Sequence, residues 1–320
     1  MNKILFVVSN HVHLARQKLL LEALGSHVTV KEVKMSQGDY GDTLPLMHEV
    51  AGHLFLTACR LIPQHDPDIV LIRGDRFEVL QVAAAATYLK KIIAHIEGGD
   101  VSGAMDEHIR HAITKLAHLH FPTNEEAKQR IMRMGEDPGR VFNFGSLDCE
   151  FALQVPKVRL IEEPYILVLH HEIPGEEGAY QGIIEAVKKT GLKHVSVRSN
   201  NDYIDAHGTN SFSPENFIRL LWGAECLVGN SSSGIKEAAA LGTPVVNVGD
   251  RQKGRLREIN VLDYPDRHGK DLDALIRKQV GMGRYPQSIV YYRPDTAKNI
   301  AKVLLEANIP FQKRYVEPED

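Results

Sequence analysis

Three acidic residues follow or face the ends of apolar, strand-like runs in this sequence. Asp75 lies just after DIVLIR (68–73), with one glycine between, and Glu97 directly follows IIAHI (92–96). Two glycines come after Glu97, and Asp106 then begins a helix-like segment. Ligands of parallel sheets bind at the carboxyl ends of the strands. Carboxylates gathered there can stabilise a sugar cation and transfer protons.

Each acid also has an ordinary structural interpretation. Aspartate is a frequent N-cap residue, so Asp75 and Asp106 could simply begin helices. Glu97 is harder to explain in this way, because glutamate is a poor cap. A carboxylate that directly follows an apolar run needs a partner or a purpose. Glu97 is therefore the candidate least easily assigned to structure alone.

A second group of polar residues lies in GNSSSGIKE (229–237), which follows the strand-like ECLV and opens a predicted helix. Hydroxyls and unpaired backbone amides at a helix start can bind phosphate. Glu237, about one turn into the helix, could reach a ribose hydroxyl pair. Plain capping by serine is the alternative. No GxGxxG follows the first strand and no P-loop motif occurs, so neither a nicotinamide dinucleotide nor a P-loop nucleotide is expected.

Histidines are numerous, at 16, but their spacing does not indicate a metal site. HExxH and clustered cysteines are both absent from the sequence. His170 and His171 are adjacent at a strand end and should point to opposite faces. We expect one to face the site and the other to pack against the sheet.

Strand-like and helix-like runs alternate along almost the whole chain, which predicts an α/β fold with parallel sheets covered by helices on both faces. A segment of mixed polarity, CEFALQVPKVRLIE (150–163), has the character of a linker. We therefore expect two doubly wound, Rossmann-like domains, residues 1–155 and 156–320, with a cleft between them. The predicted strands are 3–8, 28–33, 68–73, 92–96, 165–171, 194–199, 225–229 and 244–249.

Composition excludes some classes of function. The net charge of −3, from 38 basic and 41 acidic residues, gives no basic field that would favour nucleic acid. The apolar run in MNKILFVV is too short for a signal peptide or a membrane span. Three widely spaced cysteines without a CxxC favour a reduced protein. We expect a cytoplasmic protein that binds neither nucleic acid nor membrane.

Four strings together resemble the hydrolysing UDP-N-acetylglucosamine 2-epimerase family, over roughly residues 68–260. They are RGDRFE, HIEGGDVSGAMDEHIRHAITKLAHLHF, GEDPGRVFNFGS and GNSSSGIKEAAALGTPVVNVGDRQKGR. The resemblance implies the glycosyltransferase-B fold, with a nucleotide in the cleft between two Rossmann-like domains. In that fold the last helix, here DTAKNIAKVLLEA (295–307), returns to the first domain.

The resemblance also implies roles for individual residues. Asp75, Glu97 and Asp106 match the catalytic carboxylates, and His171 matches a histidine that contacts the diphosphate or assists its departure. Further residues match the substrate-binding positions of the family. By this resemblance they would hold the diphosphate and ribose, lie on the nucleotide side of the site, or support the acids. These are Arg110, Ser231, Ser232, Gly234, Glu237 and Arg251.

The activity implied is conversion of a UDP-N-acetylglucosamine-type nucleotide sugar to UDP and a free N-acetylmannosamine-type sugar, through a glycal, for sialic-acid-type sugars. The resemblance implies no metal or other cofactor, and a homodimer or homotetramer. The alternatives are a non-hydrolysing epimerase, a glycosyltransferase of the same fold, and a sugar-nucleotide-binding protein without catalysis. Non-hydrolysing relatives typically have HRRE where this chain has HHEI.

Two segments depart from the family pattern. After the first strand the chain has SNHVHLAR, where relatives have an arginine-containing turn, so Arg16, His11 or His13 would have to substitute. The loop SQGDYGDTL (36–44) is shorter than in relatives. These departures leave open the substituents at C4 and C6 of the sugar, and the nucleotide base.

If Glu97 and Asp106 flank the sugar, Glu97→Gln and Asp106→Asn should each lower turnover about a hundredfold or more, the scale of lost acid–base catalysis. Folding should change little. Steady-state kinetics of each purified variant measures the effect, and near-normal turnover would remove that residue from the mechanism.

Overall fold

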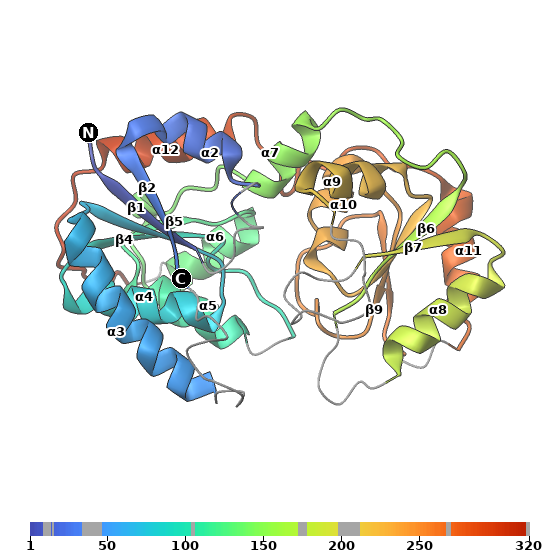
Figure 1. Ribbon diagram of the computed structural model, residues 1–320, viewed down its shortest axis with the longest axis horizontal. Coiled ribbons are helices and arrows are strands. Elements are labelled where there is room, and N and C mark those ends of the chain that lie inside the picture. Colours follow the sequence, from blue (N-terminus) through green and yellow to red (C-terminus); the bar gives the residue numbers. More distant parts are fainter. Residues whose placement is uncertain are drawn as a thin grey trace. The chain divides into compact units, whose positions relative to one another are not determined.

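The computed structural model describes residues 1–8, 14, 16–33, 47–103, 106–171, 178–197, 212–266 and 270–317. The chain divides into two compact units (Figure 1). The first unit comprises Met1–Val101, Met105–Leu147 and Arg293–Asp320. The second comprises Ser102–Ala104 and Asp148–Tyr292. The first unit is therefore discontinuous in sequence, because its last part follows the whole of the main segment of the second.

The first unit is built around a five-stranded parallel sheet in the order β2-β1-β3-β4-β5. Its strands are β1 (Ile4–Val8), β2 (Val28–Glu32), β3 (Ile69–Arg73), β4 (Ile92–Ile96) and β5 (Leu119–Phe121). Its helices are α2 (Lys18–Leu24), α3 (Met47–His65), α4 (Phe77–Tyr88), α5 (Asp106–Leu116), α6 (Glu125–Arg133) and α12 (Thr296–Glu306), with 3₁₀ turns η1 (Gly25–His27) and η3 (Pro138–Arg140).

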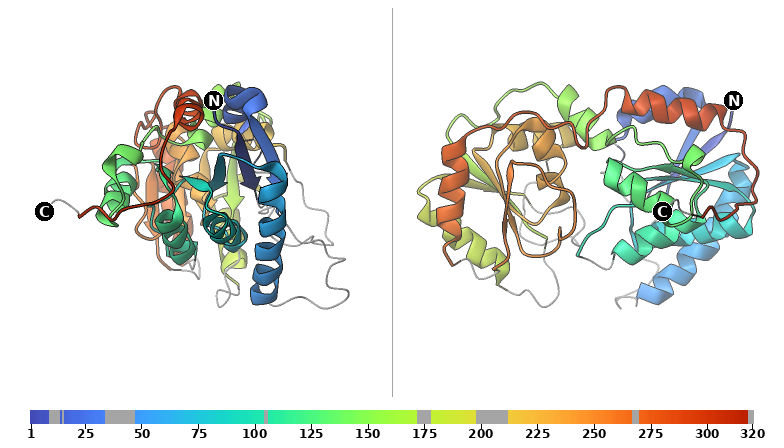
Figure 2. Two further views of the ribbon diagram at one scale, coloured as in Figure 1. Left: turned by 90° about the vertical axis from the view of Figure 1, so that its left-hand side faces the viewer. Right: turned by 180° about the vertical axis from the view of Figure 1, so that it is seen from behind.

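The strands β1, β3 and β4 of this sheet are buried on both faces, which explains their continuous apolar runs. In β1, Ile4 and Phe6 pack with α2 and α12 on one face, and Leu5 and Val7 pack with α3, α4 and α5 on the other. Figure 2 shows α2 and α12, coloured blue and red, lying together along one side of the sheet. The period of two along each strand therefore divides its side chains between two cores.

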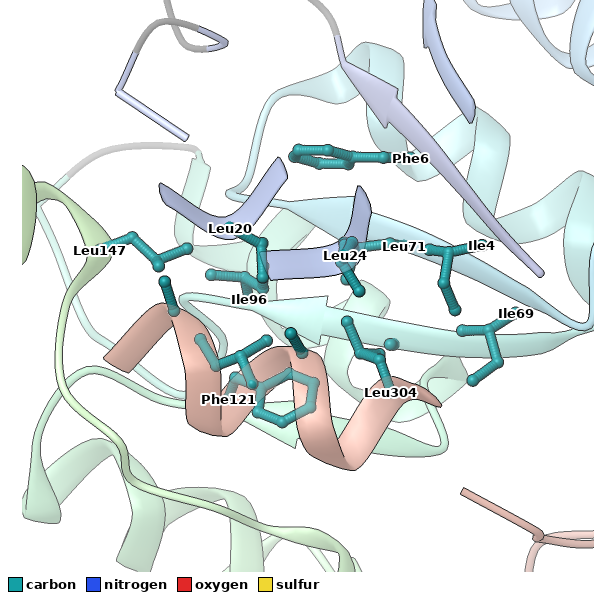
Figure 3. Packing of buried hydrophobic residues seen from close by; sticks show 14 of the residues in the cluster. Ile4, Phe6, Leu20, Leu24, Ile69, Leu71, Ile96, Phe121, Leu147 and Leu304 are labelled. Carbon is teal, nitrogen blue, oxygen red and sulfur yellow. The ribbon is translucent and has the colours of Figure 1, made fainter. Parts of the chain in front are cut away.

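Helix α12 completes the core of the first unit although it lies near the end of the sequence. Ile300 and Leu304 are buried in the same cluster as Ile4 and Phe121 (Figure 3). The side-chain amide of Asn2 donates hydrogen bonds to the carbonyl oxygens at the end of this helix, at 2.9 Å and 2.7 Å. These bonds satisfy carbonyl groups that a helix end leaves without partners.

The second unit has a parallel sheet of five strands in the order β10-β9-β8-β6-β7. The strands are β6 (Tyr165–Leu169), β7 (Lys193–Ser196), β8 (Cys226–Gly229), β9 (Val245–Val248) and β10 (Val261–Tyr264). The helices are α7 (Leu147–Gln154), α8 (Ala179–Lys189), α9 (Pro214–Gly223), α10 (Glu237–Leu241) and α11 (Leu272–Met282), with a 3₁₀ turn η4 (Ser232–Gly234). Helices α7, α9 and α10 pack on one face, and α8 and α11 on the other.

These two sheets confirm the predicted α/β class, with differences in detail. The segment predicted as a linker begins as α7, because Phe151 and Ala152 are buried against the sheet. Strands β5 and β10 and helix α11 were not predicted. None of the described helices combines the length and apolar character needed to span a bilayer. The three cysteines are free thiols.

The segment after α12 binds the C-terminal end of α5 through the buried carboxylate of Glu136. Lys313, Lys115 and His120 all contact this carboxylate, at 2.6, 2.6 and 3.1 Å. Lys313 Nζ also donates to the carbonyl oxygens of Lys115, at 2.7 Å, and Ala117. Burial alone would raise the pKa of Glu136, but its hydrogen bonds outweigh burial and lower that pKa to about 2. The C-terminal segment thereby fixes one end of α5.

We expect Glu136→Gln to lower the free energy of unfolding by about 3 kcal/mol, the lower end for breaking a buried ion pair, because Lys115 is partly in water. Urea unfolding measures the loss. The folded-state pKa is depressed, so this stabilisation is present above the ordinary value of 4.5 and is lost as the pH falls toward about 2. The difference between wild type and variant should therefore shrink over that range.

Glu22→Gln is the matched control for this measurement. Glu22 lies in the same unit, 3.8 Å from Lys18, and both side chains are more than half exposed. An exposed pair of this kind should contribute less than about 0.5 kcal/mol. Equal effects of the two substitutions would show that the Glu136 contacts do not stabilise the unit.

Candidate functional site

Asp75 and Glu97 follow neighbouring strands, β3 and β4, at the carboxyl-terminal end of the first sheet. Strands β3 and β4 pair in parallel, so both residues lie at carboxyl ends. The turn after β3 depends on Gly74, which has φ +80° and donates its backbone N–H to Ile96 O at 3.0 Å. Glu97 has φ +69°, which is uncommon for a residue with a side chain, and its N–H donates to Phe121 O at 3.0 Å. These backbone hydrogen bonds thus fix the main chain from which the side chains of Asp75 and Glu97 extend.

Arg110 of α5 fixes the carboxylate of Asp75. Its side chain is 2% exposed, its Nε donates to Asp75 Oδ2 at 3.0 Å, and its Nη2 donates to the same oxygen. Its Nη1 donates to the carbonyl oxygen of Asp100 at 2.8 Å. A guanidinium is buried at acceptable cost only when its charge and donors are satisfied. Arg110 therefore joins α5 to the segments that follow β3 and β4.

Asp106 is the first residue of α5 and lies four residues before Arg110. Residues four apart share one face of a helix, so Asp106 lies on the face that reaches Asp75. The glycines before it are required by close packing. A Cβ on Gly98 would lie 2.9 Å from Thr114 Oγ1, and one on Gly99, which has φ +77°, would lie 2.4 Å from a backbone oxygen of α6. The Gly-Gly pair thus allows α5 and α6 to approach the end of β4.

Two residues at this sheet edge were not singled out from the sequence. Arg73, the last residue of β3, places its Nη2 3.1 Å from Glu97 Oε1, and the two side chains are 7% and 19% exposed. His95 Nε2 lies 2.8 Å from the carbonyl oxygen of Gly74. A carbonyl only accepts, so Nε2 carries the proton, and burial lowers the pKa of His95 to about 4. A charged or polar residue within an apolar run was the available signal for both.

The contact between Arg73 and Glu97 changes one expectation. Glu97→Gln would remove the carboxylate that faces a buried guanidinium, and such a change is destabilising. We therefore no longer expect that substitution to leave folding unchanged.

Asn230 organises the predicted site residues of the second unit. Its side-chain amide binds both the N–H and the C=O of His171, at 2.7 and 2.8 Å, and its own carbonyl oxygen accepts from Arg251 Nη1 at 3.1 Å. Gly229 precedes it with φ +150°, and a Cβ there would lie 1.9 Å from Leu169 O. Only glycine therefore lets β8 approach β6 closely enough for Asn230 to hold His171.

The two adjacent histidines have different surroundings. Burial, followed by the positive charge of Arg251 and by His170, lowers the pKa of His171 to about 3. His171 is thus a neutral imidazole at pH 7, with one donor and one acceptor nitrogen. His170 is buried, with its ring centroid 6.5 Å from that of Tyr180 in α8. His170 is the member of the pair that packs against a covering helix.

The serine stretch, which was predicted to open a helix, opens a 3₁₀ turn that is followed by a short helix. Ser231 caps the 3₁₀ turn η4, and its Oγ accepts from the backbone N–H of Ser233 at 3.3 Å. Helix α10 begins only at Glu237 and has five residues. Glu237 is 1% exposed and its Oε1 accepts from Ser233 Oγ at 3.0 Å. A helix this short contributes little dipole, so any anion affinity here depends on hydroxyls, backbone amides and Arg251.

Several predicted features lie elsewhere. His11, His13 and the loop 36–44 fall outside the described residues, and Arg16 precedes α2. Within the described ranges, no three histidine, cysteine or acidic side chains are grouped so that they could hold a metal ion. A pocket of about 450 Å³ lies beside the C-terminal segment and is lined by none of the predicted site residues.

A protein-family model described as UDP-N-acetylglucosamine 2-epimerase matches residues 5–305. The chain belongs to this family. Two epimerase relatives have substantial identity. A Legionella pneumophila protein named UDP-N,N'-diacetylbacillosamine 2-epimerase (hydrolyzing) is 34% identical over 73% of this chain and 72% of its own length. A Neisseria meningitidis protein named UDP-N-acetylglucosamine 2-epimerase is 30% identical over 85% of this chain and 80% of its own length.

Among solved structures, the Methanocaldococcus jannaschii UDP-GlcNAc 2-epimerase, in complex with UDP-GlcNAc and UDP, has a TM-score of 0.75. It covers 95% of this chain and 99% of its own at 15% identity. This likeness confirms the predicted glycosyltransferase-B-like fold. Its low identity limits the comparison to the fold.

Proposed function

We propose that this epimerase-family chain is a hydrolysing 2-epimerase. It would convert a UDP-N-acetylglucosamine-type nucleotide sugar to UDP and a free N-acetylmannosamine-type sugar. The observation that carries the proposal is the pair of carboxylates, Asp75 and Glu97, each held by a buried arginine at one sheet edge. The name of the Legionella relative supports the hydrolysing type.

The chemistry requires carboxylates of this kind. The C2 hydrogen of the sugar is barely acidic until the anomeric C–O bond begins to break and its electron pair leaves with UDP. Carboxylates stabilise the resulting cationic character at C1, as they do in glycosidases. One carboxylate then takes the C2 proton, and the C–H electron pair forms the C1=C2 bond of a glycal. Water adds to C1 through its oxygen and gives one proton to a carboxylate, while a carboxylic acid of the cluster delivers a proton to the other face of C2.

The residues around Asn230 fit the departing diphosphate. Arg251 supplies a positive charge, neutral His171 can donate one hydrogen bond, and the hydroxyls of Ser231 and Ser232 lie next along the chain. Preorganised donors aimed at developing negative charge are usually the largest contribution to catalysis. In this proposal Glu237 contacts the ribose.

A non-hydrolysing epimerase is the second candidate, because the Neisseria relative is named without the hydrolysing qualifier. The two types share the first half of the reaction and differ in what adds to the glycal. In the non-hydrolysing type UDP returns, so the sugar stays attached to the nucleotide.

A reaction in deuterated water distinguishes these candidates. Elimination followed by hydration takes the new C2 hydrogen from solvent, so the released N-acetylmannosamine-type sugar should carry deuterium at C2. Free UDP should accumulate at the same rate. Proton NMR of the mixture reads both products, with UDP-N-acetylglucosamine and its C4- and C6-substituted analogues as substrates.

The other outcomes are equally clear in the same spectra. Deuterium at C2 of a sugar that stays on UDP would identify the non-hydrolysing type. Free sugar with protium at C2 and the gluco configuration would contradict elimination and the roles of Asp75, Glu97 and Asp106.

The diphosphate assignment has its own test. Replacing both Ser231 and Ser232 by alanine should weaken UDP binding by about 1–3 kcal/mol, the range for hydrogen bonds to a charged group. Titration calorimetry measures the affinity. Ser213→Ala is the matched control, because Ser213 caps α9 in the same unit through a 3.2 Å bond from Asn216 N. If the control weakens UDP binding equally, the effect is lost capping rather than lost ligand contact.

A further inference from the structure

Arg73 is a charged residue at the end of an otherwise apolar strand. The four residues before it in β3 are fully buried, and the arginine side chain itself is only 7% exposed. Its Nη2 lies 3.1 Å from Glu97 Oε1 on the neighbouring strand end. Removing a guanidinium from water is costly unless an opposite charge compensates. The position of this cation therefore depends on the carboxylate of Glu97.

The two partners differ in access to solvent. The Glu97 side chain is 19% exposed, against 7% for Arg73, so the carboxylate lies nearer the surface and the guanidinium lies deeper. The backbone of Glu97 is held in place by its bond to Phe121 O, at 3.0 Å. A ligand at this edge would meet Glu97 before Arg73. The contact at 3.1 Å gives Arg73 a direct electrostatic effect on the Glu97 carboxylate.

Other charged groups lie on the segments that follow β3 and β4 and on the helices α5 and α6. Asp75 and Arg110 neutralise each other as an ion pair, and Arg130 donates to Gly99 O. Burial lowers the pKa values of His95 and His120, so both are neutral at pH 7. These segments also carry the acids Asp100, Asp106, Glu107 and Glu78, the histidines His108 and His111, and Lys115, which pairs with Glu136. Neighbouring acids disfavour a further negative charge, whereas a guanidinium at 3.1 Å favours it.

We propose that Arg73 is a positioning residue that keeps Glu97 ionised among the neighbouring acids, and so makes Glu97 the base that takes the C2 proton. This assignment rests on the proposed epimerase activity and adds to it a choice between the acids. Clustered carboxyl groups share protons, so a proton could reside on any of them. The carboxyl group that takes the C2 proton, however, must begin the reaction ionised. The fixed cation beside Glu97 decides which carboxyl begins the reaction without a proton.

The test is the pH dependence of kcat/KM for Arg73→Gln and Arg73→Lys. Without the cation, Glu97 should hold its proton to higher pH, so the acidic limb of the Arg73→Gln profile should move up by about one to three pH units. Each unit corresponds to a tenfold loss of kcat/KM on that limb. Arg73→Lys keeps the charge, so its limb should stay where it is in the wild type.

Arg76→Gln is the matched control. Arg76 follows the same strand end and is also a paired arginine, 2.6 Å from Glu78, but its side chain is 36% exposed. Its removal should leave the acidic limb unmoved. A folded Arg73→Gln variant whose activity falls equally at every pH would overturn the proposal, because a merely structural role predicts that result. If Arg73→Gln does not fold, a limb displaced in Arg73→Lys would overturn it instead.

A second measurement separates this proposal from the proposed function. Carbon-13 NMR of the Glu97 carboxyl, assigned by comparison with Glu97→Gln, follows its titration without any substrate. The carboxyl should titrate at higher pH in Arg73→Gln than in the wild type, and an unchanged titration would overturn the role of Arg73. Suppose that the titration moves in Arg73→Gln as expected, but that the wild-type protein neither exchanges C2 nor releases UDP. The epimerase function and the assignment of Glu97 as its base would then be contradicted, while the electrostatic role of Arg73 would stand.

Discussion

The carboxylate site depends on one buried ion pair, between Arg110 and Asp75. The guanidinium is a rigid planar fork, so its bonds to Asp75 and to the carbonyl of Asp100 restrict α5 relative to two strand ends at once. The other end of α5 is held through Lys313, which binds its last carbonyls and Glu136. A helix held at both ends can carry a catalytic side chain with little positional freedom. That property is what oriented acid–base chemistry requires.

The two units hold their site residues by different means. In the first unit, buried arginines pair with acids. In the second, the neutral amide of Asn230 fixes the backbone of His171, and Arg251 donates to the carbonyl oxygen of Asn230. In the proposed function, the acids of the first unit would act at the C1–C2 region of the sugar, and the residues around Asn230 would act on the diphosphate.

The sequence indicated most of this fold because both sheets are buried on both faces, which leaves long apolar runs between polar turns. The same signal failed for β10, in which only Tyr264 is buried, and for α7, where mixed polarity and the following Pro156 suggested a linker. The acids were singled out because strand ends are where ligands bind. The charge of Arg73 in an apolar run was a visible signal, but nothing local in DIVLIR shows that its guanidinium turns toward the neighbouring strand end. Pairing across strands depends on tertiary structure, which composition and periodicity do not encode.

The discontinuity of the first unit has a consequence for biosynthesis. One face of its sheet is covered by α2 and α12 together, so the core that contains Ile4, Leu71 and Phe121 stays incomplete on that side until residues 296–304 have been translated. The second unit has no such requirement, because its main segment is continuous and can fold as soon as it emerges. All residues of the second unit are therefore translated before the last residues of the first unit. A nascent chain stalled before α12 would carry an apolar surface of the kind that chaperones bind.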